Sequence, residues 1–328
     1  MQTAKPKIEL YKIRSFSDKF NDTFSFVTQN WRQLLRYLCI FVLPISMLGA
    51  WCMDVYTSSI FGAGMGYGNP NLSYLSFVLA YACYALFAII ASMVTASIAY
   101  GFMRLYGEKG AIAERLPYKE FSPVFSKMFR RACIMVLVWL GIFATLVIVC
   151  VLFALITPVL IVVPILAIIA VGVPLALISP AYMLTDDSIW KSMGKAWRYG
   201  WATWGGVFGV LVVMTLFVYI GAGALSLPYI VCVAVKSLLL STSDASALSG
   251  AGGAVFTVLA YISSVLANFA SSVFSVLLFV ILGYQFGHSA EKIDGVTVQK
   301  DVEQFDHIDS PDDAPAVESD DISNFDQL

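Results

Sequence analysis

Residues 132–185 decide the fold, and they read ACIMVLVWLGIFATLVIVCVLFALITPVLIVVPILAIIAVGVPLALISPAYMLT, without one charged side chain. A bilayer core about 30 Å thick is crossed by about 20 apolar helical residues, so this run is long enough to cross twice. Its one break is Ile156-Thr157-Pro158. Proline is well tolerated at the first position of a helix, where its missing N–H would have no partner. We therefore predict a transmembrane hairpin.

Similar apolar runs lie on both sides of this hairpin. Working outward, we predict six spans: Tyr37–Val55, Tyr74–Met103, Ala132–Ala154, Val159–Met183, Thr203–Leu225 and Ala254–Tyr284. The predicted fold is an all-α, polytopic transmembrane helical bundle whose six spans form three hairpins. The segment Pro228–Leu240 fits an outer interfacial segment, a re-entrant segment or part of a span. Lys236 makes it ambiguous, because a lysine at mid-membrane costs about 2.5–3.5 kcal/mol; Asp54 is expected to meet Lys236 or to snorkel.

The composition supports a membrane protein. The chain has 328 residues, of which 59% are hydrophobic and 13% charged, and its mean hydropathy is +0.79. Soluble domains are about 45–50% apolar and about 25% charged. The net charge of -2 leaves no basic surface for nucleic acid. These values exclude a soluble enzyme, a disulfide-stapled secreted domain and a nucleic-acid binder.

The basic residues predict the orientation, since loops rich in Lys and Arg stay on the cytoplasmic side. With the N-terminus inside, the cytoplasmic segments hold 19 of the 20 Lys and Arg residues, and only Lys236 lies outside. Residues 1–36 contain no short apolar core with a cleavage site, so we predict no signal peptide. The expected location is the inner membrane, with both termini cytoplasmic.

Three domains follow from this topology. Residues 1–36 form an N-terminal cytoplasmic segment with an interfacial amphipathic helix, 37–284 the six-span domain, and 285–328 an acidic, mostly disordered tail. The tail has 12 acids against 2 bases, a composition that cannot bury a core.

Each outward-going span follows an amphipathic segment with aromatic residues three or four apart and basic residues nearby. We interpret the segments as interfacial helices on lipid, although aromatic and basic residues gather at most span ends. The candidate lipid contacts are Trp31, Arg32, Phe125, Arg130, Arg131, Trp190, Lys195, Trp197 and Arg198.

The sequence offers little for catalysis or metal binding. The six cysteines lack a Cys-x-x-Cys spacing, and the two histidines, His288 and His307, fall at a span end and in the tail. Neither a nucleophile elbow nor a phosphate loop is found. We expect no enzyme activity, no cofactor and no metal. The interiors of the second to sixth spans carry no Asp, Glu, Lys, Arg or His, which argues against ion-coupled transport.

The last span has one polar face. Ser264, Asn268, Ser271 and Ser275 recur at intervals of four, three and four residues, which places them on the same side of a helix. Such a face favours close helix packing; the alternative is a groove for a lipid or small solute. Gly205 and Gly209, and Ala88, Ser92, Thr95 and Ala99 on the second span, are candidate partners.

Two stretches carry a resemblance to a known family. Residues 186–200 read DDSIWKSMGKAWRYG, and residues 284–295 read YQFGHSAEKIDG. They resemble the glycerophosphodiester phosphodiesterase membrane-domain-like proteins, a broad set of bacterial six-span proteins. The resemblance implies a membrane location, this fold and a link to lipids. It transfers no catalytic residue, because the phosphodiesterase of that family is a separate soluble barrel.

The tail repeats a Phe-Asp-x-aliphatic pattern, with Phe305 and Ile308 in one copy and Phe325 and Leu328 in the other. Two linked docking peptides would gain avidity for a cytoplasmic protein, although a solvated tail without a partner is the simpler alternative. The predicted function is a non-enzymatic inner-membrane scaffold or accessory protein that contacts membrane lipids and a cytoplasmic partner. The alternative is an uncoupled transporter or channel for a lipid or small neutral solute.

Overall fold

The chain is all-α, as predicted. The computed structural model describes residues 8–64, 70–110, 116–156, 162–241 and 250–299, with Val302, and within them there is no strand. Its helices are α1 (Phe16–Gly64), α2 (Pro70–Lys109), α3 (Tyr118–Ile156), α4 (Val162–Leu175), α5 (Ile178–Leu184), α6 (Ile189–Ala202), α7 (Trp204–Ser241) and α8 (Gly250–Asp294). Six segments are long and apolar enough to cross a membrane, α4 and α5 together forming one. The protein is therefore a multi-pass membrane protein.

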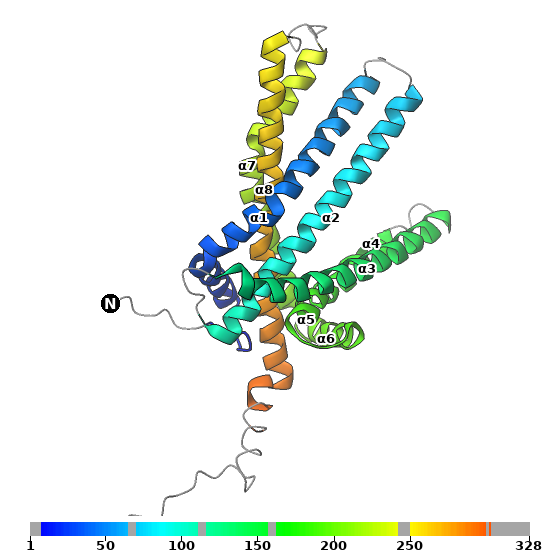
Figure 1. The fold of residues 1–328 in the computed structure, drawn as a ribbon. Helices are drawn as coiled ribbons and strands as arrows, with labels where there is room; N and C mark the ends of the chain where they lie inside the picture. The colour runs from blue at the N-terminus through cyan, green and yellow to red at the C-terminus, as the bar shows by residue number, and fades with distance from the viewer. Residues whose placement is uncertain are drawn as a thin grey trace, which may run out of the picture.

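The three predicted hairpins are present, and Figure 1 shows them spreading apart from a common end. They pair α1 with α2, α3 with α4, and α7 with α8. The common end holds the end of α2, the start of α3, α6 and the end of α8, with most of the basic residues described, and we call it the basic end. Its core is aromatic and includes the fully buried Tyr37, Phe102 and Phe121.

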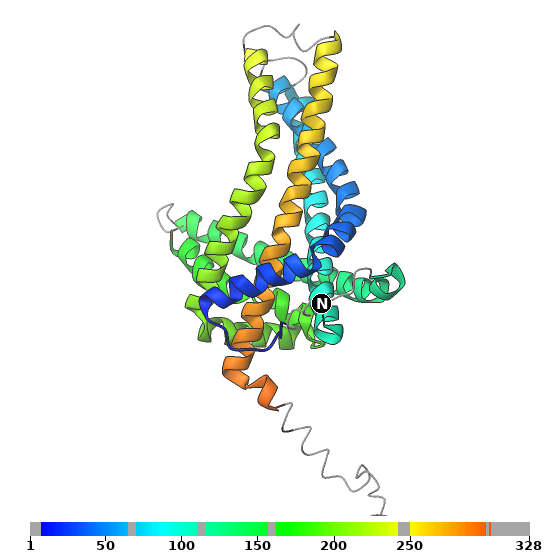
Figure 2. The ribbon, with the colours of Figure 1, turned by 90° about the vertical axis from the view of Figure 1, so that its left-hand side faces the viewer.

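The amphipathic segments differ from the prediction of three interfacial helices. The first is part of α1, whose start lies across α7 and α8 before the helix turns toward the far end (Figure 2). Its residues Phe20, Phe24 and Val27 pack against Val210, Met214, Leu277 and Ile281. The second is continuous with α3, and Phe121 and Met128 are fully buried. Only the third segment, α6, is a separate helix, and its tryptophans are exposed. The same amphipathic pattern fits both outcomes, because an apolar face can cover protein as well as lipid.

Helix α7 extends beyond the predicted span end at Leu225 and runs through Pro228 to Ser241. The segment therefore continues the helix of the fifth span and does not turn back as a re-entrant segment would. Lys236 is compensated there: its ammonium lies 3.7 Å from Asp54 Oδ1 and donates to Ser58 Oγ at 3.0 Å. The expected meeting of Lys236 with Asp54 is confirmed.

Helix α8 does not end at Tyr284 but continues to Asp294. Gln285 and Ser289 are fully buried, and the Ser289 and Thr203 hydroxyls share a hydrogen bond of 2.8 Å. Gly295 has a φ of +57°, the left-handed conformation that commonly ends a helix. The first ten residues assigned to the acidic tail are thus helix packed on the bundle.

An N-terminal strap, residues 8–15, fastens the basic end. The Ile8 N–H donates to the Tyr106 hydroxyl of α2 (3.2 Å), and the Arg14 N–H donates to His288 Nδ1 of α8 (3.0 Å). A β-carbon on Gly287 would collide with the Leu10 carbonyl oxygen, so the strap needs glycine there. His288, which the sequence placed at a span end, is accordingly buried on α8 beneath the strap.

A polar pocket between three helices as the candidate functional site

A pocket lies between α1, α2 and α8, at the depth of the apolar spans. Its volume is about 140 Å³, which is enough for several water molecules or a small polar group. The lining residues are Ile45, Ser46, Gly49, Tyr84, Phe87, Ala88, Ala91, Ser92, Thr95, Asn268, Ser271, Ser272 and Ser275.

The polar face of α8 forms one wall. Asn268, Ser271 and Ser275 line the pocket, whereas Ser264, one turn earlier on the same face, is buried outside it. The opposite wall comes from α2 and includes Ala88, Ser92 and Thr95. Their small size had favoured them as partners of the polar face. The other suggested partners lie elsewhere, because Gly209 faces Phe16 and Ala99 is in the aromatic core.

Most polar groups of the pocket bond within their own helix. Asn268 Nδ2 donates to the Ser264 carbonyl (2.9 Å), and the Thr95 and Ser275 hydroxyls donate to carbonyls four residues earlier at 2.7 Å. One bond crosses between helices: the Tyr84 hydroxyl donates to Asn268 Oδ1 at 3.3 Å. The hydroxyl oxygens on this wall consequently retain lone pairs that can accept hydrogen bonds.

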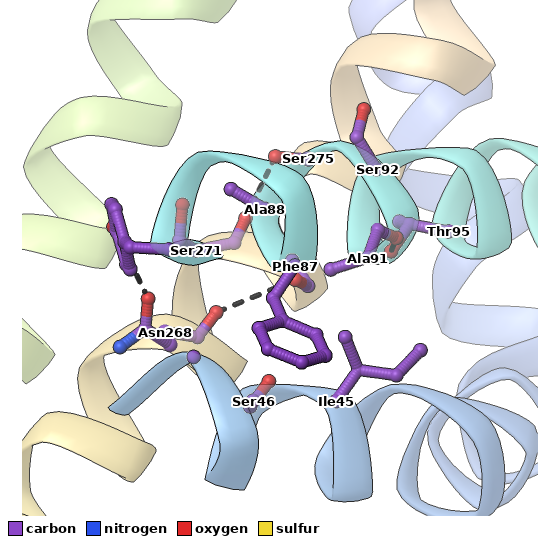
Figure 3. A pocket seen from close by; sticks show the side chains of 13 residues that line it. Ile45, Ser46, Phe87, Ala88, Ala91, Ser92, Thr95, Asn268, Ser271 and Ser275 are labelled. Atoms are coloured by element: carbon purple, nitrogen blue, oxygen red, sulfur yellow. Dashed lines mark hydrogen bonds between the residues drawn. The ribbon is translucent and has the colours of Figure 1, made fainter. Parts of the chain in front are cut away.

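Ser46 on α1 is the exception. Its side chain is buried, with 3% of the residue exposed, and its hydroxyl has no hydrogen-bond partner. Figure 3 shows the side chains of Ser46, Phe87 and Asn268 gathered around the same space. A buried hydroxyl without a partner costs about 1–3 kcal/mol, so a ligand or water that bonds to Ser46 would stabilise the protein.

The pocket opens sideways between α2 and α8. Ala88, Ser92 and Ser271 line it and are also exposed on the surface of the bundle. The opening therefore lies on the outer surface of two helices that are long and apolar enough to span a membrane. The lining carries no charge at neutral pH, because its tyrosine is neutral there. The pocket therefore offers neutral hydrogen-bonding groups to a molecule that arrives from the lipid phase.

A second cavity of about 100 Å³ lies nearer the basic end. It shares Ser92 with the first, and it is bounded by α2, α3, α5 and α8 through residues that include Met135, Ser179 and Phe279. Its lining is mainly apolar, so it suits the apolar part of a ligand whose polar group lies in the first pocket.

The candidate lipid contacts fall into two groups. Trp31, Arg32, Arg130, Trp190 and Trp197 are exposed, and Trp190 is 79% exposed. They are available to lipid headgroups, and contact with them stays a prediction.

The remaining candidates are occupied by protein contacts. Phe125 turns inward and stacks on Phe41, with ring centres 4.7 Å apart. Lys195 pairs with Asp187 (2.5 Å), and Arg198 pairs with Asp294. Their charges are thus engaged in holding α6 to its surroundings.

Arg131 was expected on the lipid surface, but it joins α3 to the α5–α6 connection. Its guanidinium donates to the carbonyls of Tyr182 (2.9 Å), Thr185 and Asp187 (2.7 Å). The neighbouring Asp186 binds Arg104 at 2.5 Å and Lys127 at 2.8 Å. Hydrogen bonds from these two cations hold the pKa of Asp186 well below its ordinary value. This cluster is structural.

Ser46 and Tyr84 are polar residues of the pocket that the sequence pattern did not single out. Ser46 is the one serine or threonine in the predicted first span, and this could have drawn attention to it.

The tail residues Phe305, Ile308, Phe325 and Leu328 lie outside the described residues. Among those described, no three His, Cys, Asp or Glu side chains gather as a metal site would require.

Comparisons with known proteins leave the family open. No protein-family model, curated protein or solved structure matches the chain. The resemblance to the phosphodiesterase membrane-domain-like proteins therefore stays a prediction.

Proposed function

We propose that this protein is a non-enzymatic inner-membrane protein that binds a membrane lipid in the pocket between α1, α2 and α8 and acts as a scaffold or accessory protein. The observation that carries the proposal is the Ser46 hydroxyl, buried without a partner in a pocket whose mouth lies on the exposed surface of the predicted spans. Both features favour a ligand that enters from the bilayer and hydrogen-bonds at depth.

The chemistry of the lining selects the class of lipid. The pocket supplies hydroxyls and an amide but no cation, so a charged phosphate would lose its hydration without compensation. A lipid with a small uncharged polar group, a hydroxyl or a carbonyl, suits it better. Diacylglycerols and isoprenoid alcohols have this chemistry.

The proposal includes the orientation of the protein in the membrane. The basic end faces the cytoplasm, because 19 of 20 Lys and Arg residues fall in segments on that side. The exposed Trp190, Trp197 and Arg130 then lie at the level of the inner-leaflet headgroups.

A cytoplasmic protein partner is proposed through the tail, where Phe305 and Phe325 repeat in one pattern. Replacing both by alanine should reduce recovery of a stoichiometric partner after mild-detergent purification. Recovery equal to that of the wild type would remove the tail from the proposal.

The second candidate function is uncoupled passage of a small neutral solute. It is favoured by the second cavity, which adjoins the pocket at Ser92 and leads toward the basic end. Proteoliposomes separate the two functions, because a solute pathway conducts glycerol whereas a lipid site leaves the vesicles as tight as protein-free controls.

The lipid proposal is tested by mass spectrometry of lipids that remain on the purified protein. Ser271→Leu places a bulky side chain at the exposed mouth of the pocket and should remove the bound neutral lipid. Thr145→Leu is the matched control, since Thr145 is exposed in the span of α3 and does not line the pocket. Equal lipid retention by wild type and both variants would refute the proposal.

A further inference from the structure

Lys19 is a buried cation at the basic end, in the first turns of α1. Only 4% of the residue is exposed. Its ammonium faces the start of α7: a β-carbon placed on Gly206 would lie 3.9 Å from Lys19 Nζ and 3.6 Å from Gln285 Nε2 of α8. Three helices therefore converge on this ammonium.

The charged groups around Lys19 are cations. Burial, and after it the positive charges of Lys292 and Arg14, lower the pKa of Lys19 to about 8. His288 is near the same cations. Because its Nδ1 accepts the Arg14 N–H at 3.0 Å, its Nε2 carries a hydrogen in the neutral ring and can donate.

No carboxylate among the described residues pairs with Lys19. Asp22 is bound to Arg14 at 2.7 Å, Asp294 to Arg198 and Tyr199, and Glu291 accepts from the Thr297 N–H at 3.0 Å. A buried ammonium without a counter-ion is costly. The acids that could neutralise it are thus engaged elsewhere.

The start of α7 adds to the positive potential. An α-helix carries a partial positive charge at its first turn, and anions are stabilised there. Helix α7 begins at Trp204, close to the glycine that faces Lys19. At the adjoining Gly205, an added β-carbon would have no atom within 4 Å, so that side of the turn has open space.

We propose that Lys19, with the first turn of α7 and His288, binds a phosphate group. The ligand is an anion because the Lys19 ammonium is buried and the neighbouring carboxylates of Asp22 and Asp294 are paired with arginines. The membrane level of the start of α1 favours the phosphate of a phospholipid, and free inorganic phosphate has the same chemistry. This site lies apart from the neutral pocket, which has no cation, and does not depend on the function proposed for that pocket.

The test uses the full chain in a neutral detergent after delipidation, with the thermal midpoint as readout. Inorganic phosphate and mixed micelles that contain phosphatidylglycerol are added separately, with micelles that contain a neutral glycolipid without phosphate, and chloride at equal ionic strength, as references. A rise with phosphate identifies the free anion, and a rise with phosphatidylglycerol alone identifies the lipid headgroup. An unchanged midpoint with both probes would overturn the proposal.

Lys19→Met keeps the length of the side chain and removes its charge. It should weaken the midpoint response, with at least a 10-fold higher phosphate or lipid concentration needed for half the effect. Lys12→Met is the control at an exposed lysine of the strap and should respond as the wild type does. If the methionine variant does not fold, Lys19→Arg retains the charge and should retain the response. A Lys19→Met protein that responds like the wild type would refute the assignment of the site to Lys19.

Discussion

The pocket and the basic end both place polar side chains between helices, but they satisfy them in different ways. In the pocket, Thr95 and Ser275 bond to carbonyls of their own helices. At the basic end, Arg131 on α3 bonds to carbonyls of α5 and of the connection that follows it. Bonds between helices hold the fold, whereas bonds within a helix leave lone pairs and space for a ligand. This difference favours the pocket as the proposed neutral-lipid site, and it gives Arg131 and its partners the role of holding the helices together.

The largest expected loss of stability comes from replacing Arg131. Arg131→Met should lower the free energy of unfolding by about 1.5–3 kcal/mol, because three carbonyls lose hydrogen bonds from a charged donor. Arg130→Met changes an exposed neighbour and should stay within about 0.5 kcal/mol of the wild type. Both values come from reversible unfolding in mixed micelles. Equal effects would show that Arg131 does not join the helices.

The second test acts on the strap. Gly287→Ala forces the strap away from α8, because the added carbon meets the Leu10 carbonyl, and should cost about 1–3 kcal/mol. Limited proteolysis should then cut near the N-terminus sooner. Gly194→Ala is the control on α6, where a β-carbon meets nothing within 4 Å. Unchanged proteolysis of the Gly287 variant would contradict the packing described.

A substitution in the pocket should lower the free energy of unfolding less than the substitutions at the basic end do. Asn268→Leu removes the bond from the Tyr84 hydroxyl and should cost about 0.5–2 kcal/mol. The variant should also retain less neutral lipid. Wild-type stability together with wild-type lipid content would show that the polar face neither packs the helices nor binds a ligand.

Sequence predicted the parts of this arrangement that repeat with helical period. Serines and an asparagine at intervals of four, three and four residues predicted one wall of the pocket, and small residues on the second span predicted the facing wall. Ser46 could not be placed in the same way, because a single serine in an apolar span has no periodicity. Its position opposite Asn268 depends on how α1 and α8 cross, which is a tertiary property.

Amphipathic patterns predicted helices but not what covers them. Phe20 and Phe121 have the spacing of a lipid-facing surface, yet they cover α7 with α8 and the aromatic core, respectively. The pattern was the same for α6, whose tryptophans are exposed. Helix ends were missed for a related reason. The charge of Lys236 argued against a span beyond Leu225, although its pairing with Asp54 was expected, and the polar Gln285 was assigned to the tail although it donates to Thr203 in the bundle.

The central claim is that Ser46 serves a ligand and not the fold, and Ser46→Ala tests it most directly. Because the hydroxyl has no protein partner, its loss should leave the unfolding free energy of the delipidated protein unchanged within about 0.5 kcal/mol, or raise it. The same variant should hold neutral lipid about fivefold less tightly, the equivalent of one hydrogen bond worth about 1 kcal/mol. Lipid titration followed by native mass spectrometry measures this. Weaker binding at unchanged stability is the predicted result, and unchanged binding would contradict the account.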